Sequence, residues 1–267
     1  MARGVSGAGA AKPHGRPDAE SSPPAESERR RIVAFASDAR ALARGLLGMT
    51  LVRVVGGERM AGTIVEVEAY LGPSDRACHT AGGRRTRRNA SMWLAAGHAY
   101  VYFIYGMHHC VNVVSGGGAA VLIRALRPTE GVAAMALRRG VGIPASVGER
   151  PQRPRRAPSV AAPAPRSGPR LALLCGGPAR LAEAMAIDLE LDGEDLRRSD
   201  RLWVERGPAR AAAERRVVAT PRIGVDSAGA WARRRLRFVL AAEAAWASRG
   251  GGQGGSRRSA PRVSNPG

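Results

Sequence analysis

The chain has 267 residues, enough for one large domain or two small ones, and its hydrophobic content of 44% is sufficient for a buried core. Lys and Arg number 42 against 22 Asp and Glu, and the resulting formal net charge of +20 favours a polyanionic partner. No run approaches the roughly 20 apolar residues of a membrane span, and the N-terminus lacks the apolar segment of a signal peptide. We therefore expect a cytoplasmic protein with no membrane partner.

The positive charge is almost entirely arginine, because Lys12 is the only lysine. The two termini and the segment 141–172 account for only about half of the net charge. An arginine-rich coding bias with solvated tails is the alternative to a polyanion partner, and it does not explain the remaining half. The three cysteines, Cys78, Cys110 and Cys175, have no CxxC spacing, which is typical of reduced thiols in the cytosol.

Residues 1–30 are rich in Ala, Gly, Pro, Ser and charge, and this composition predicts a disordered tail. A helix is expected from Asp38 to Leu47, with Ser37 as N-cap and Gly48 at the C′ position. Strands are then expected over 50–55 and 60–70, joined by a turn at 56–57.

The end of this hairpin carries alternating polar and apolar residues. In a regular strand Glu66, Glu68 and Tyr70 share one face, and Gly72-Pro73 ends the strand. Either carboxylate could therefore serve a site on that face, and the pattern does not choose between Glu66 and Glu68.

The next segment is a basic loop, residues 82–89, with four arginines within five residues: Arg84, Arg85, Arg87 and Arg88. Such a loop is suited to phosphate contacts, although a solvated surface loop would have the same composition. A short helical turn is expected over 91–95.

The strongest strand pattern runs from Tyr100 to Val114 and resumes from Ala119 to Leu126 after a glycine turn, which predicts two adjacent antiparallel strands. A helix is expected from Pro128 to Arg139. Residues 141–172 hold seven of the 18 prolines and are interpreted as a flexible Pro/Arg-rich insertion.

Beyond the insertion, Gly177 and Pro178 are expected to open a helix that reaches Ile187. Strands are expected over 202–205, 217–225 and 236–240. These elements predict one folded domain over 31–246, followed by a second disordered tail over 247–267.

A set of short motifs occurs in order along the chain: Glu68-Ala69-Tyr70-Leu71-Gly72-Pro73, Asp75, His79, Gly82-Gly83, Arg88-Asn89, Tyr100-Val101-Tyr102, Ile104-Tyr105-Gly106-Met107, Asn112, Leu122, Arg124-Ala125-Leu126, Cys175-Gly176-Gly177-Pro178, Gly207-Pro208, Arg222-Ile223-Gly224, Ala228-Gly229 and Trp231-Ala232. Through these motifs the sequence resembles the alkyladenine (3-methyladenine, or methylpurine) DNA glycosylase family over about residues 40–240, apart from the insertion. The resemblance implies a single compact α+β domain around a curved antiparallel sheet with flanking helices. It also implies a monomer that uses no cofactor and no metal.

The resemblance assigns the activation of a water to Glu68, aided by Arg124 and by main chain near Ile223. It implies that Tyr70, His79 and Tyr102 sandwich an extruded base in a pocket. Its other assignments are the DNA-intercalating wedge to Tyr105, the exclusion of normal guanine to Asn112, and a pocket wall to Leu122. Without the resemblance, the tyrosines at 100, 102 and 105 would be ordinary strand aromatics.

The implied reaction is removal of alkylated purines such as 3-methyladenine from double-stranded DNA by base flipping, with deaminated purines such as hypoxanthine as a further candidate. A carboxylate can both take the proton of the attacking water and oppose the developing positive charge of the sugar. Because the only lysine lies in the N-terminal tail, no amine is available for a Schiff base. We therefore expect a monofunctional glycosylase of base excision repair that leaves an abasic site.

Two alternatives remain at this level. Cys78-His79 and His108-His109-Cys110 could meet as a zinc site, but they lack the usual paired spacings and no metal is expected. A non-catalytic DNA- or RNA-binding module would use the same basic surface. We expect a cytoplasmic protein of bacterial type, and association with DNA would place it on the nucleoid.

Overall fold

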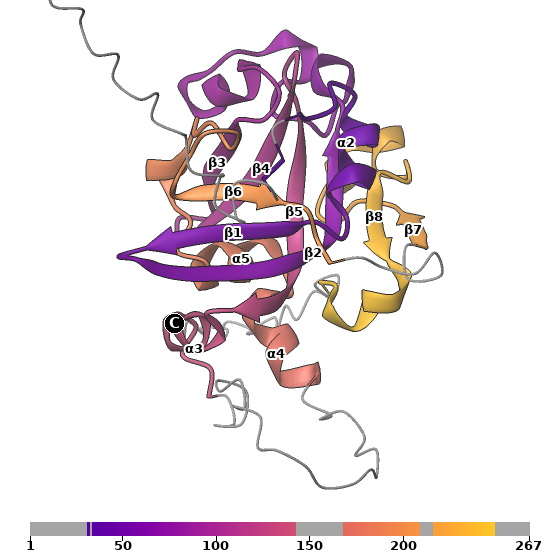
Figure 1. Ribbon diagram of the computed structural model, residues 1–267. Helices are drawn as coiled ribbons and strands as arrows, with labels where there is room; N and C mark the ends of the chain where they lie inside the picture. Colours follow the sequence, from indigo (N-terminus) through magenta and orange to yellow (C-terminus); the bar gives the residue numbers. More distant parts are fainter. Residues whose placement is uncertain (1–30, 33, 143–167, 209–215, 249–267) are drawn as a thin grey trace, which may run out of the picture.

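Eight antiparallel strands form one sheet in the computed structural model, which describes residues 31–32, 34–142, 168–208 and 216–248 (Figure 1). Six strands follow the order β3-β4-β5-β2-β1-β6, and β8 pairs with both β2 and β7. The strands are β1 (Thr50–Val55), β2 (Glu58–Tyr70), β3 (Ala99–Ile104), β4 (His108–Gly116), β5 (Ala119–Glu130), β6 (Leu202–Glu205), β7 (Val217–Thr220) and β8 (Arg237–Leu240). The sheet curls into a half-barrel with helices around it, so the predicted single α+β domain around a curved antiparallel sheet is confirmed.

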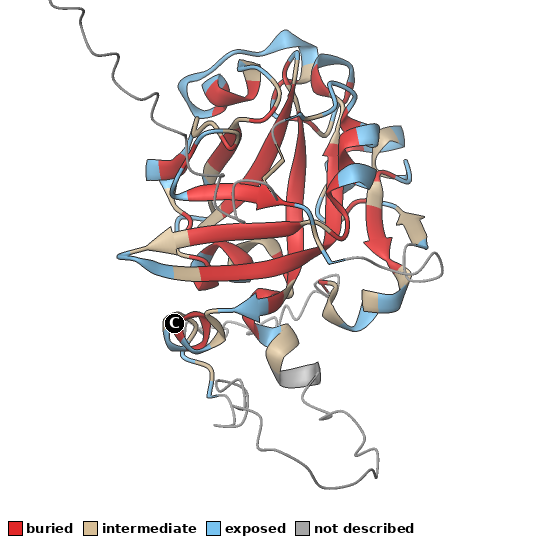
Figure 2. Cartoon of the chain, in the orientation of Figure 1, coloured by how far each residue is buried: buried red, intermediate tan, exposed pale blue. Residues whose placement is uncertain are grey.

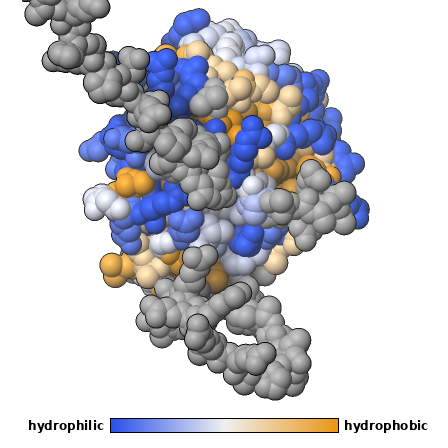
Figure 3. All heavy atoms as spheres, viewed as in Figure 1, coloured by the Kyte–Doolittle hydropathy of each residue, from blue (hydrophilic) through white to orange (hydrophobic). Residues whose placement is uncertain are grey.

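The α-helices are α2 (Ala39–Leu46), α3 (Val132–Arg138), α4 (Gly168–Cys175) and α5 (Pro178–Ala184). Short 3-10 segments connect the other elements: η1 (Gly72–Ser74), η2 (Ala81–Gly83), η3 (Arg87–Trp93), η5 (Leu189–Leu191), η7 (Asp226–Trp231) and η8 (Ala241–Trp246). Helix α5 packs on β4 and β5, and α2 buries Leu42, Ala43 and Leu46 against the sheet. Figure 2 shows the strands of the sheet largely buried between these elements, while polar side chains cover much of the surface of this face (Figure 3).

The 13-residue strand β2 is the centre of the sheet. It pairs with β5 along most of its length, with β1 over 58–63, and with β8 over 66–68. The pairing with β5 shifts register on either side of Glu66, which is the mark of a β-bulge. The C-terminal half of β2 therefore lies between β5 and β8, with its backbone bent at the bulge.

Several predicted boundaries differ from the structure. The N-cap of α2 is Asp38 and not Ser37, because the Asp38 carboxylate accepts a 2.8 Å hydrogen bond from Ala41 N. The expected strand from Tyr100 to Val114 is two strands, since the chain reverses at residues 105–107 and gives the hairpin β3–β4. Apolar and aromatic residues continue into this reversal, and so the sequence pattern concealed it.

The expected helix over 128–139 begins only at Val132, because β5 continues to Glu130 and pairs with β2 through a register shift beside Pro128. The expected helix over 178–187 ends at Ala184, and the expected strand over 217–225 ends at Thr220, before Pro221. Helix α4 occupies residues 168–175, so the end of the predicted insertion is helical, and residues 143–167 lie outside the described part. The predicted tails 1–30 and 249–267 also lie outside it, whereas Ser248 is buried against the sheet.

Candidate active site

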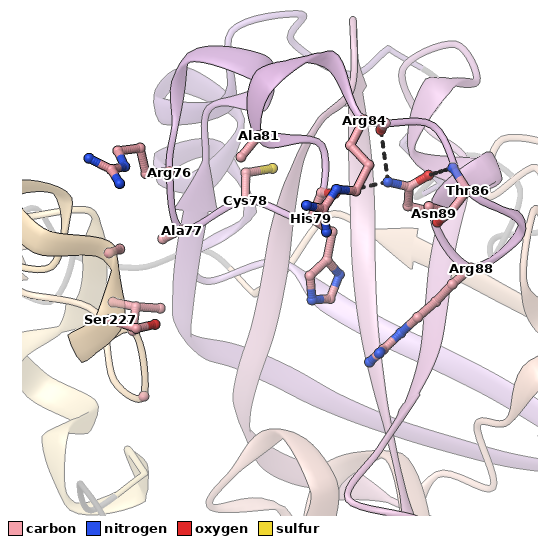
Figure 4. Close-up of a pocket in the computed structure, with 13 residues that line it drawn as sticks. Arg76, Ala77, Cys78, His79, Ala81, Arg84, Thr86, Arg88, Asn89 and Ser227 are labelled. Atoms are coloured by element: carbon pink, nitrogen blue, oxygen red, sulfur yellow. Dashed lines mark hydrogen bonds between the residues drawn. The ribbon is translucent and has the colours of Figure 1, made fainter.

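A cavity of about 320 Å³ opens between the C-terminal end of β2, the hairpin β3–β4, strand β5 and the segment 223–225. Its wall is largely aromatic and apolar, as expected for a site that holds a flat organic group. Of the predicted site residues, the cavity wall contains Tyr70, His79, Tyr102, Tyr105, Asn112, Leu122, Arg124 and Ile223. A second hollow of about 450 Å³ adjoins it along residues 77–79 and 224–225 and is lined by Arg76, Arg84 and Arg88 (Figure 4).

Glu68 lies behind the cavity wall and is fully buried. Its Oε2 accepts a 2.9 Å hydrogen bond from the Tyr70 hydroxyl and lies 3.2 Å from Nη1 of Arg124. Its Oε1 accepts a 2.8 Å hydrogen bond from Ile223 N. Burial raises the pKa of Glu68, whereas the Arg124 charge, the Ile223 N–H and the Tyr70 hydroxyl act against this rise. A carboxylate can accept about four hydrogen bonds, so it retains capacity for a water.

Glu66 shares the face of Glu68 but has a different environment. It is also fully buried, and Arg124, Arg237 and Ser248 all donate hydrogen bonds to it. Glu66 does not line the cavity, while three direct partners of Glu68 do. The two carboxylates that the sequence pattern could not distinguish are therefore separated by their surroundings.

The aromatic wall is built by contacts between its own members. His79 Nδ1 lies 2.6 Å from the Tyr100 hydroxyl, and the His79 and Tyr102 rings meet nearly edge to face with centroids 4.7 Å apart. Desolvation and the nearby Arg88 charge both lower the pKa of His79, so its imidazole is neutral at neutral pH. Burial raises the pKa of Tyr70 and Tyr102 well above the usual value, so both phenols stay protonated.

Asn112 and Leu122 form a cross-strand pair between β4 and β5 at the cavity wall, and both are almost fully buried. The Asn112 side-chain amide donates a 2.9 Å hydrogen bond to the Tyr100 carbonyl. This bond fixes the orientation of the Asn112 side chain within the wall.

A buried ion pair holds the segment that carries Ile223. The Arg222 guanidinium binds both carboxylate oxygens of Asp75, at 2.5 and 2.9 Å, and both side chains are fully shielded from solvent. Arg222 also donates to the Ala69 carbonyl and lies 4.7 Å from the centre of the Tyr70 ring. Asp75 and Arg222 belonged to the family-like motifs, but the sequence analysis gave them no role in the site.

The predicted phosphate-binding arginines lie beside the cavity on exposed backbone from η2 to η3. Asn89 holds this loop in place: its Oδ1 accepts from Thr86 N, and its Nδ2 donates to the carbonyls of His79 and Arg84. Arg88 donates to the Phe103 carbonyl and lies over the Tyr102 ring, with its side chain directed away from the loop (Figure 4). Arg85 stacks on Trp93 at 3.9 Å, which leaves the loop with two of its four arginines supported by aromatic rings.

Tyr105 occupies the tip of the β3–β4 hairpin and not a strand, so it is not the ordinary strand aromatic that the local pattern alone suggested. It is 80% exposed, at the edge of the cavity, with a φ of 55°. Gly106 follows with a φ of 68°, and Met107 N donates to the Ile104 carbonyl across the turn. A left-handed conformation is uncommon for a tyrosine and is typical of functional positions.

Cys78 and Cys110 are free thiols buried in the cavity wall. Burial raises the pKa of Cys110, as expected for a thiol that is not a nucleophile. In the part of the chain that the structure describes, no group of three or more His, Cys, Asp and Glu side chains is arranged to hold a metal ion.

Comparison with known protein families covers the strands and helices that surround the cavity. The sequence profile of the methylpurine-DNA glycosylase family matches residues 33–244, which include every residue of the candidate site described above except Ser248. The chain belongs to this family. The predicted relationship to this family is thereby confirmed.

The similar proteins share a name that refers to one class of lesion, 3-methyladenine. The DNA-3-methyladenine glycosylase of Mus musculus is 43% identical over 208 residues, 77% of this chain and 57% of that protein. The DNA-3-methyladenine glycosylase of Homo sapiens is 41% identical over 227 residues, 82% of this chain and 68% of that protein. A putative 3-methyladenine DNA glycosylase of Methanocella arvoryzae is 43% identical over 200 residues, 74% of this chain and 84% of that protein. The chain thus spans under two thirds of the mouse protein and most of the archaeal one.

Among the described helices of this family member, none combines the length and apolar character needed to cross a bilayer.

Proposed function

We propose that this member of the family is a DNA glycosylase that hydrolyses the N-glycosyl bond of alkylated purines, such as 3-methyladenine, in double-stranded DNA. The observation that carries the proposal is the fully buried carboxylate of Glu68 beside an aromatic cavity. Its three direct partners, Tyr70, Arg124 and Ile223, line that cavity. The names of the relatives support the same lesion class.

In the proposed reaction, Glu68 accepts a proton from a water that attacks C1′ of the sugar, and the purine departs with the electrons of the glycosyl bond. Glu68 also opposes the positive charge that develops on the sugar. Arg124, the Tyr70 hydroxyl and the Ile223 N–H hold the carboxylate in place and favour its ionised form. Glycoside hydrolysis usually needs a second carboxyl group to protonate the leaving group, but an alkylated, cationic purine needs less help of this kind.

The aromatic wall supports selection for electron-poor rings. A purine between Tyr70, His79 and Tyr102 would lie against π-faces, which attract a cationic ring. Because His79 is neutral at neutral pH, it adds no repulsion toward such a base. We assign the exclusion of normal guanine to Asn112, because the exocyclic amino group of guanine would meet its buried side chain, and a wall of the pocket to its neighbour Leu122. Hypoxanthine lacks this group and remains a candidate substrate.

A purine must leave the duplex to reach this cavity. We propose that Tyr105, the exposed residue at the hairpin tip, inserts into the duplex and fills the gap left by the extruded base. The phosphate contacts are assigned to Arg84, Arg85, Arg87 and Arg88. No lysine is present among residues 13–267, so no Schiff base is proposed and the product is an abasic site.

Replacing Tyr105 with serine is expected to lower the single-turnover rate of excision from duplex DNA by roughly 10- to 100-fold, because the unstacking cost of a few kcal/mol would no longer be offset. Tyr105→Phe keeps the ring and should remain near wild type, which makes it the matched control. A serine variant as active as the phenylalanine variant would remove Tyr105 from the proposed mechanism.

The rate of excision is expected to fall on the acid side with an apparent pKa above 4.5, the ordinary value for glutamate. Only the ionised carboxylate can accept the proton, and burial raises its pKa, so activity is lost as the pH falls through this raised value. Tyr70→Phe should move the acid limb further upward, because the phenol no longer donates to the carboxylate. Single-turnover rates across pH provide the measurement, and an acid limb at or below the ordinary value would contradict the assignment of Glu68.

The reaction itself can be tested with a duplex that carries one 3-methyladenine or one hypoxanthine. Incubation with the protein followed by alkali should cut the strand at the lesion, because an abasic site is labile to alkali. Tight binding without scission would instead favour a non-catalytic DNA- or RNA-binding module. Borohydride should trap no covalent complex, and recovery of one would contradict the monofunctional mechanism.

A further inference from the structure

Glu66 is surrounded by more hydrogen-bond donors than any role in the proposed chemistry requires. Its Oε1 accepts from Arg124 Nε at 3.0 Å, from Arg237 Nε at 2.5 Å and from the Ser248 hydroxyl at 2.7 Å. Its Oε2 accepts from Ser248 N at 2.5 Å. Since the carboxylate has no exposed surface, these donors replace its entire hydration.

Arg124 is held from two sides by this arrangement. Its Nε is directed to Glu66, and both Nε and Nη2 donate to the Ser248 hydroxyl at 3.2 Å. Its remaining terminal nitrogen, Nη1, lies 3.2 Å from Glu68. A planar guanidinium that is fixed at Nε and Nη2 has no freedom to turn Nη1 away from Glu68.

We propose that Glu66, together with Arg237 and Ser248, is a positioning residue that fixes Arg124 toward Glu68 and the cavity. This inference rests on the function proposed above. Glu66 and Glu68 then have different roles, because Glu66 acts through Arg124 and does not touch the base or the water. It also makes the chain around Ser248 part of the site, beyond the segment that the family profile matches.

The charges around Glu68 make the proposal testable by pH. The groups that face Glu68 are Glu66 and Tyr70 from β2, Arg124 from β5, and Cys110 from β4, with Arg222 from the segment after β7 and Arg237 from β8 close by. Asp75 neutralises Arg222, and Glu66 is the partner of Arg237. Arg124 is thus the cation in direct contact with Glu68 among the described residues, and its displacement would change the ionisation of Glu68 most.

Replacing Glu66 with glutamine is expected to release this arrangement, because the amide keeps one oxygen and turns an NH₂ group toward donors. Displacement of Arg124 should slow single-turnover excision about tenfold or more. It should also move the acid limb upward by about one pH unit, because a cation in contact lowers a carboxylate pKa by roughly 1–3 units. If Glu66 were only a nearby negative charge, its removal would lower the pKa of Glu68, and the acid limb would move down. A downward shift or no shift would overturn the proposal.

Two further variants distinguish a change in the position of Arg124 from a general loss of stability. Ser248→Ala keeps both arginines and Glu66, and should slow excision about threefold with a smaller upward shift of the acid limb. Glu205→Gln is the matched control, because Glu205 is also buried, with Arg59 and Trp203 as partners, but lies on β6 away from the cavity. It should alter thermal stability without moving the acid limb. Equal pH profiles for Ser248→Ala and Glu205→Gln would also refute the proposal.

The wild-type protein in the same assay reports on the proposed function alone, because an inactive wild type would refute that function whatever the variants do. The crystal structure of Glu66→Gln then gives a readout that needs no activity. The positioning role predicts that Arg124 Nη1 moves beyond salt-bridge distance from Glu68. An unchanged contact between Arg124 and Glu68 would overturn the inference and leave the proposed function intact.

Discussion

Replacing Glu68 with glutamine is expected to lower the single-turnover rate of base excision by roughly 10²- to 10⁴-fold, the range for loss of a general base. The amide keeps the size of the side chain and can still accept from Ile223 N, but it cannot take the proton of the water. Affinity for a lesion-containing duplex should be nearly unchanged, since the phosphate and aromatic contacts remain. Excision and binding must therefore be measured on the same preparation, by alkali-induced strand scission and by titration with labelled duplex.

The control for this substitution is Glu58→Gln, which changes an exposed glutamate at the start of the same strand and should leave the rate unaffected. After this substitution Arg124 keeps Glu66 as its partner, so no buried cation is left unpaired, and the variant is expected to unfold at nearly the wild-type temperature. A Glu68→Gln protein that still cleaves at the wild-type rate would assign the water to another group.

Replacing Arg222 with methionine is expected to lower the free energy of unfolding by about 3–5 kcal/mol, because it leaves the fully buried carboxylate of Asp75 without its cation. The same change should slow excision, since Arg222 holds the backbone that presents the Ile223 N–H to Glu68. Urea denaturation followed by circular dichroism would measure the loss of stability.

Two comparisons isolate the buried charge as the cause. Arg197→Met breaks a pair with Asp195 that remains partly open to solvent, and it should cost less than about 1 kcal/mol. The double variant Arg222→Met with Asp75→Asn removes the unpaired charge and should recover part of the lost stability. A loss at Arg222 no larger than the loss at Arg197 would mean that this ion pair does not hold the segment in place.

Local sequence patterns predicted the strands of the sheet better than the turns at which the chain reverses direction. The hairpin β1–β2 and the strand ends at Val55 and Tyr70 follow from alternation and from Gly-rich turns, and these predictions agree with the structure. The turn at Tyr105 was missed because a tyrosine at positive φ carries no signal in an apolar, aromatic run. Strand β5 extends past Pro128 because its pairing with β2 outweighs the local preference for a helix start.

For the candidate site, strand parity placed Glu66, Glu68 and Tyr70 on one face, and the family resemblance singled out Glu68. The groups that distinguish the two carboxylates come from residues 222–223, 237 and 248. These contacts span 150 residues or more of chain, and no pattern within a strand can predict them. Ser248 shows this most clearly, because its local sequence is typical of a tail while its hydroxyl is buried against two charged groups.

In the mechanism proposed for Tyr105, the conformation of the hairpin tip affects the energetics of searching DNA. A tyrosine held at a φ of 55° costs of order 1–3 kcal/mol, and this cost is met once, when the protein folds. The ring is then held out from two hydrogen-bonded strands and need not be ordered during each encounter with a duplex. An intercalating side chain on a long loop would lose conformational entropy at every base pair that it tested. A preorganised tip therefore favours rapid sampling of many undamaged sites, with little free energy lost at each one.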